Sequence, residues 1–195
     1  MLKKLNHGVE IIVQVGGWAL LAAACLVTYD VITRKLLNIS IAGADEISGY
    51  VFAVSTACAF SYALLHRSNI RIDIVYKLLP PMAQRLLDIL SMVLTGGFLA
   101  IVCIFAFNLV YDAFAFGSRS ITPLQTPLAI PQTLWFAGLC LAVLTSVVLT
   151  FAAIAALIRG DQAQAVKLIG VPSLDEEIET EIGSGEPGDD GDGGR

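Results

Sequence analysis

Four long runs of residues without a charged side chain alternate with short polar segments along the chain. The runs cover residues 11–29, 47–65, 89–111 and 134–158. A helix needs about 20 mostly apolar residues to cross the hydrocarbon core of a bilayer, and every run is close to this length or longer. The pattern therefore predicts an all-α membrane protein with four transmembrane helices.

The segments between the runs predict two helical hairpins. Residues 36–44 contain turn-forming residues and provide a short connection between the first two spans. Residues 112–131 join the last two spans and contain three prolines, which favour a loop over a regular helix. The first run could instead be a signal peptide with a cleavage site near Cys25, but it exceeds the 7–15 apolar residues of a usual signal core.

The central connector, residues 66–85, combines basic side chains with an apolar face. Its apolar residues from Ile74 to Leu79 follow the spacing of one face of a short helix. Pro80 and Pro81 would end this helix, and Pro81 suits the first position of the next one. We expect a short amphipathic helix at the membrane interface, between the second and third spans.

Basic residues are distributed unevenly over the segments outside the runs. Eight lie in the first segment, the central connector and residues 159–169 after the last run, whereas the segments between the first two runs and between the last two runs hold Arg34, Lys35 and Arg119. Because Lys and Arg accumulate on the cytoplasmic side, both termini are expected in the cytoplasm. We divide the chain into a transmembrane domain, residues 1–169, and a tail, residues 170–195. The tail is acidic and rich in glycine, which favours disorder.

Charged residues near the predicted outer ends of the first two spans suggest local roles. Asp30 and Arg34 are four residues apart, the spacing of an ion pair on one helix face. Asp45 and Glu46 precede the second run, where carboxylates stabilise the amino end of a helix. Alternatively, Glu46 and Arg34 form an outward-facing polar site for a partner, and the two interpretations are compatible.

The runs themselves contain no Asp, Glu, Lys, Arg or His. Such residues within a span usually mark ion paths, proton relays or substrate sites, so a carrier that works alone is not expected. His7 and His66 fall outside the runs, which disfavours axial ligation of haem within the membrane. The cysteines lack the spacing of a metal site, and no phosphate loop or nucleophile elbow occurs. We therefore predict a protein that is not an enzyme, holds no cofactor or metal, and binds no nucleic acid.

Several short motifs follow one another over residues 5–160. They are an arginine at the end of the first span, an acidic pair opening the second, a polar triplet in the central connector, and two prolines four apart followed by a tryptophan. The residues are Arg34, Asp45, Glu46, Asn69, Arg71, Asp73, Pro127, Pro131 and Trp135. In this order of motifs the chain resembles the small membrane subunit, DctQ-like, of tripartite ATP-independent periplasmic (TRAP) transporters. The family pattern has His where this chain has Asn69.

The resemblance implies a division of labour in a bacterial inner membrane. A soluble periplasmic protein would capture an organic acid such as a dicarboxylate. A large membrane subunit would hold the sodium and substrate sites and move. The small subunit would widen the static scaffold and help to dock the binding protein, with the motif residues in structural or interface roles. Two other classes stay open: a membrane anchor for a redox enzyme, and a structural membrane protein without a transport role.

Overall fold

The computed structural model describes residues 2–39, 41–67 and 79–159, and its regular elements are four long helices. They are α1 (Leu2–Leu37), α2 (Ala44–Leu65), α4 (Pro81–Ala115) and α5 (Ala129–Ile158). Each is long and apolar enough to cross a membrane, which confirms the four predicted spans. The predicted amphipathic helix and acidic tail lie outside the described residues, and so do Asn69, Arg71 and Asp73.

The helix boundaries follow from residues at their ends. Pro81 is the first residue of α4 and follows the N-cap residue Pro80. Proline is tolerated there because the backbone N–H groups of a first turn have no acceptor within the helix. The loop before α5 is shorter than predicted: α4 continues to Ala115, and Pro131 lies inside the first turn of α5. The sequence pattern predicts a loop at all three prolines of this connector. A proline in a first turn does not interrupt a helix, because the N–H that it lacks would have no partner there.

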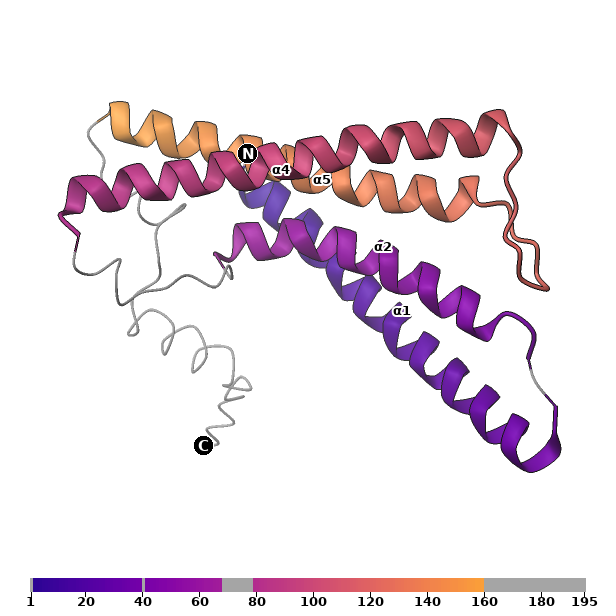
Figure 1. The fold of residues 1–195 in the computed structure, drawn as a ribbon. Helices are drawn as coiled ribbons and strands as arrows, with labels where there is room; N and C mark the ends of the chain where they lie inside the picture. The colour runs from indigo at the N-terminus through magenta and orange to yellow at the C-terminus, as the bar shows by residue number, and fades with distance from the viewer. Residues whose placement is uncertain (1, 40, 68–78, 160–195) are drawn as a thin grey trace, which may run out of the picture.

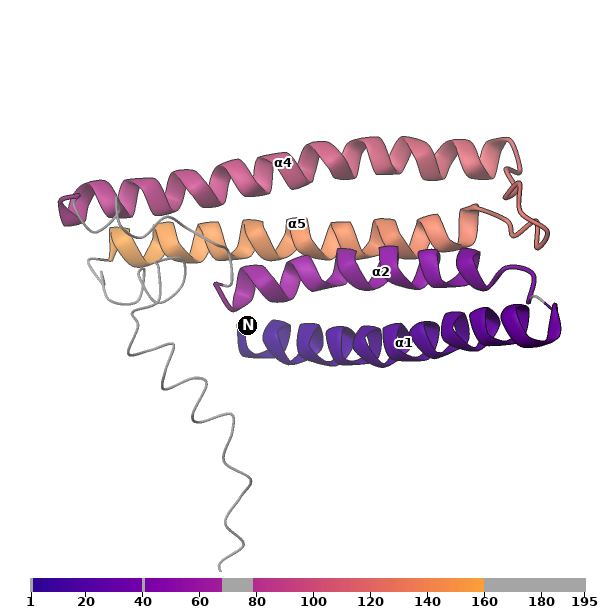
Figure 2. The same cartoon turned by 60° about the horizontal axis from the view of Figure 1, so that its bottom comes forward.

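The helices form a single row in the order α1, α2, α5, α4. Contacts join α1 to α2, α2 to α5, and α5 to α4 (Figure 2). The two hairpins, α1–α2 and α4–α5, are therefore held together mainly by α2 and α5, and the α1–α2 pair is inclined to the other pair (Figure 1). The loops within both hairpins lie at the same end of the row, which we call the loop end.

The core of the row surrounds α5. One buried cluster contains Leu64 of α2, Met92 and Leu99 of α4, and Leu149 of α5. A second cluster, nearer the loop end, joins α2, α4 and α5 through Ala57, Ala106 and Leu139. Since α1 contributes to neither cluster, it is an edge helix that packs mainly on α2.

A glycine allows close approach at each of the three helix–helix contacts. The Gly16 carbonyl on α1 accepts a hydrogen bond from Ser55 Oγ on α2, at 3.2 Å. A Cβ on Gly138 of α5 would lie only 2.9 Å from the Ala57 Cβ on α2. A Cβ on Gly96 of α4 would overlap the hydroxyl of Ser146 on α5. Small residues at these positions let the helix backbones approach closely, and this close packing holds membrane helices together.

Candidate functional site

The loop end gathers most of the polar side chains that sequence analysis singled out. Asp30, on the last turns of α1, has a side chain that is only 1% exposed. Its carboxylate pairs with Arg34, as the four-residue spacing predicted, and accepts a hydrogen bond from the backbone N–H of Ile41 at 2.6 Å. One buried carboxylate thus fixes the end of α1 to the chain that leads into α2.

Gly43 sets the start of α2 and also touches the second loop. Its φ of 96° lies in the left-handed region, where glycine is favoured. The side chain of Leu124, from the loop between α4 and α5, occupies the space that a Cβ on Gly43 would need. The two hairpin loops therefore pack directly against each other.

Glu46 forms the polar counterpart of this contact. Its carboxylate accepts a hydrogen bond from the hydroxyl of Tyr50 at 2.6 Å and another from the hydroxyl of Thr122 in the second loop. Asp45 lies beside it in the first turn of α2 and is exposed. Both carboxylates occupy the first turn, as predicted, but the N-cap residue is Gly43 and has no side-chain hydrogen bond.

The second loop is an ordered turn and not merely a tether. The Ser120 N–H donates to the Thr126 carbonyl at 3.0 Å, and the Leu128 N–H donates to the Ser118 carbonyl at the same distance. Arg119 and Pro127 face each other in an isolated antiparallel bridge. This pairing leaves Ile121 fully exposed near the tip.

Sequence reasoning assigned no role to two residues of this network. Tyr50 follows Glu46 by four residues, so helical spacing alone could have indicated their hydrogen bond. Thr122 is far from Glu46 in the sequence, and no local pattern links them. Nor does Arg34 pair with Glu46, since its carboxylate partner is Asp30 on its own helix.

Two further motif residues belong to α5. Pro131 is buried and lines an apolar groove, whereas Trp135 is half-buried and packs on the cluster of Ala57, Ala106 and Leu139. Pro127 is exposed, in the bridge with Arg119. The motif residues that the structure describes thus lie at or near the loop end, but they do not converge on one cavity.

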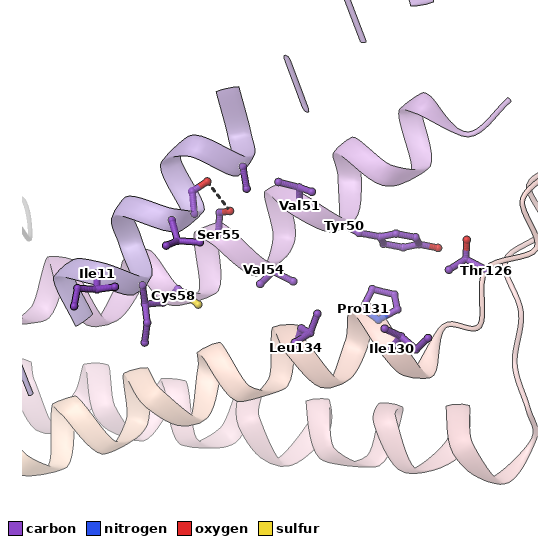
Figure 3. Close-up of a pocket in the computed structure, with 14 residues that line it drawn as sticks. Ile11, Tyr50, Val51, Val54, Ser55, Cys58, Thr126, Ile130, Pro131 and Leu134 are labelled. Atoms are coloured by element: carbon purple, nitrogen blue, oxygen red, sulfur yellow. Dashed lines mark hydrogen bonds between the residues drawn. The ribbon is translucent and has the colours of Figure 1, made fainter. Parts of the chain in front are cut away.

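The groove lined by Pro131 has a volume of about 520 Å³. It runs between α1, α2 and the start of α5, with Tyr50 and Thr126 at one end and Ile11 and Cys58 at the other (Figure 3). The hydrogen bond between Ser55 and Gly16 lies in its wall. Its lining is mostly apolar and includes no charged side chain, so the groove suits hydrocarbon.

No group of three His, Cys, Asp or Glu side chains comes together among the described residues. His66 follows the last residue of α2 and stacks on Tyr62, and His7 lies in the first turns of α1, so neither histidine is within the middle of a span. The hydrogen bonds to Asp30 hold the end of α1 on the first loop, and those to Glu46 hold α2 on the second loop.

The comparisons with known proteins identify the family. The sequence model of the family described as "Tripartite ATP-independent periplasmic transporters, DctQ component" matches residues 23–161, a stretch that includes every motif residue named above. Searches of curated proteins and of solved structures gave no match. The resemblance drawn from the motifs is thereby confirmed. The chain is a multi-pass membrane protein that belongs to the DctQ family, the small permease component of TRAP transporters.

Proposed function

We propose that this chain is the static scaffold of a sodium-coupled importer of organic acids in a bacterial inner membrane. In this role it holds the large transport subunit and contributes to the surface on which the periplasmic binding protein docks. Family membership supports the assignment to a transporter. The observation that carries the scaffold role is the row of helices closed by three glycine contacts, with no charged side chain in the middle of any span.

A subunit that carried substrate itself would need polar groups within the membrane. Moving a carboxylate or a sodium ion through a span requires charges or oxygen ligands at its centre to replace water. The charge-free runs 11–29, 47–65, 89–111 and 134–158, which form the middle of α1, α2, α4 and α5, carry no such charge. The transported ion and substrate therefore belong to the larger partner, and this chain provides a rigid edge.

The arrangement of charge supports an outward-facing loop end. Three bases lie at the loop end, Arg34, Lys35 and Arg119, whereas five lie at the opposite end of the row, Lys3, Lys4, Arg67, Arg85 and Arg159. With the more basic end in the cytoplasm, the loop end faces the periplasm. The exposed side chains of Asp45, Arg119 and Ile121 then form the docking surface for the binding protein.

Reconstitution tests this assignment. Liposomes that contain the large subunit and this chain, supplied with binding protein and a sodium gradient, should accumulate labelled organic acid. Liposomes with either membrane subunit alone should not. Uptake by this chain alone would contradict the proposal, and so would full uptake by the large subunit alone.

Docking has a separate readout. Replacing Arg119 with Glu should weaken binding of the periplasmic protein to the reconstituted complex by several-fold, with the complex still assembled. Replacing Arg159 with Glu, at the opposite end, is the matched control and should leave this affinity unchanged. Equal effects of the two substitutions would show that the loop end is not the docking surface.

A further inference from the structure

We propose that Cys103 of α4 and Cys140 of α5 form a reversible disulfide that locks the contact between these two helices. The oxidant would be a lipid-soluble quinone, and a dithiol reductant would restore the free thiols. No part of the scaffold role requires this pair, so the inference stands on different observations.

The two sulfur atoms are already in contact across the helix pair. Cys103 Sγ and Cys140 Sγ lie 3.5 Å apart, and both side chains are half-buried. Cys103 packs against the cluster of Ala57, Ala106 and Leu139. Both thiols thus lie on facing sides of adjacent helices and stay partly accessible.

The thiol pair lies close to the point where Gly96 brings α4 and α5 together. From Gly96 to Cys103 is about 10 Å along α4, and from Ser146 to Cys140 is about 9 Å along α5, at about 1.5 Å per residue. The two helices are antiparallel, so the glycine contact and the thiol contact lie in register on one seam. Because the glycine contact fixes the spacing two turns away, the thiols have little freedom to separate.

The other two cysteines have no comparable neighbour. Cys25 is exposed on α1, and the Cys58 sulfur packs at Gly138 of α5. The structure describes all four cysteines, and the pair of Cys103 and Cys140 is the thiol–thiol contact it shows. Oxidation should therefore be selective for this pair.

The chemistry requires a small approach and a two-electron acceptor. A disulfide bond is about 2.05 Å long, so the sulfur atoms, 3.5 Å apart, must approach by about 1.5 Å. Two S–H bonds break and one S–S bond forms. The two electrons and two protons that the thiols lose convert one quinone to one quinol, which balances the reaction.

Depth in the membrane selects the class of oxidant. Cys140 lies about 16 Å along α5 from its first residue, near the middle of this 30-residue helix and so in the expected hydrocarbon region. Water-soluble oxidants reach this depth poorly, whereas quinones dissolve in the hydrocarbon. The bond would close a ring through the whole α4–α5 loop and would oppose separation of the hairpin.

Thiol counting in the assembled complex tests the proposal. Membranes that contain the complex are treated with a short-chain quinone, then denatured and labelled with a maleimide. We expect the labelled thiols of this chain to fall from four to two, and peptide mass spectrometry to find a Cys103–Cys140 link that a dithiol removes. The peptide analysis uses the unaltered chain, so it does not depend on whether a variant folds.

Matched variants complete the experiment. Cys103→Ala and Cys140→Ala should each abolish the loss of thiols, whereas Cys25→Ala and Cys58→Ala should each leave the loss of two thiols intact. Four labelled thiols after quinone treatment of the unaltered chain would overturn the proposal. A link that involves Cys25 or Cys58, or one that joins two copies of the chain, would overturn it as well.

Discussion

Helices α1 and α5 are both strongly apolar, yet their surroundings differ. The most apolar 18-residue stretch of α1 has a mean hydropathy of 2.0, and that of α5 has 2.6. Of the residues in these stretches, only 6% are buried in α1 but 33% are buried in α5. Helix α5 packs between α2 and α4, whereas α1 packs mainly on α2. Large side chains such as Trp18 and Leu21 on α1 remain exposed.

The comparison teaches that hydropathy identifies a span but not its neighbours. The size of the residue at each crossing point decides which helices approach closely, and α5 offers Gly138 and Ser146 to two different helices. The exposed face of α1 is left for lipid or for the large subunit. Substitutions at the glycines of α5 and of α1 should therefore differ in their effect on stability.

The largest expected effect is at the contact that joins the two hairpins. Gly138→Leu would force a side chain into the space beside Ala57, whose backbone carbon would lie 3.2 Å from the new Cβ. Overpacking of this kind costs about 1–3 kcal/mol, and the backbone contact places leucine towards the upper value. Reversible unfolding in mixed micelles measures the change. Gly17→Leu, on the edge helix with no atom near its Cβ, is the control and should lose no stability, because leucine is favoured over glycine in a helix by up to about 1 kcal/mol.

Next in size is the buried carboxylate at the loop end. Asp30→Ala would leave the Ile41 N–H without its acceptor and remove the partner of Arg34. Because Arg34 is 53% exposed and water can solvate it, we expect a loss of about 1–2 kcal/mol in the same assay. Asp30→Asn keeps an acceptor for Ile41 and should lose less. Asp45 is exposed. If Asp45→Ala lost as much stability as Asp30→Ala, the burial of Asp30 would not explain the loss.

A smaller effect is expected where the two loops meet. Glu46→Ala removes the acceptor of Tyr50 and Thr122, a loss of about 1 kcal/mol. The change should appear first as faster hydrogen exchange at the amides of Ser120 and Leu128, which pair within the second loop. Glu46→Gln keeps an acceptor, so in this variant the amides of Ser120 and Leu128 should exchange almost as slowly as in the parent chain. Unchanged exchange in the alanine variant would show that Glu46 does not order this loop.

The smallest effect is at the edge contact. A Cβ on Gly16 would lie 3.2 Å from Ser55 Oγ, and this hydroxyl can rotate away, so Gly16→Ala should be nearly neutral. Gly17→Ala meets nothing and should gain up to about 1 kcal/mol from helix propensity. The difference between these neighbouring variants measures how tightly α1 is held. A larger loss at Gly16 than at Gly138 would reverse the ranking of edge and centre.

Some of this structure could be predicted from the sequence and some could not. The four spans and the Asp30–Arg34 pair follow from local patterns, since length and four-residue spacing determine them. Of the neighbouring glycines Gly96 and Gly97, Gly96 meets Ser146 and Gly97 meets no atom of another helix. Which face of a helix meets which neighbour is a property of the whole row. The same holds for Glu46 and Thr122, which no sequence spacing relates.

The central claim is that this chain stays rigid while its partner moves. Spin labels at Lys35 on α1 and Phe114 on α4, in a complex whose native cysteines are replaced, would report the distance between the two outermost helices. Double electron–electron resonance should give one narrow distance distribution that does not change when sodium and substrate-loaded binding protein are added. A shift of that distribution, or a second population under transport conditions, would contradict the scaffold role.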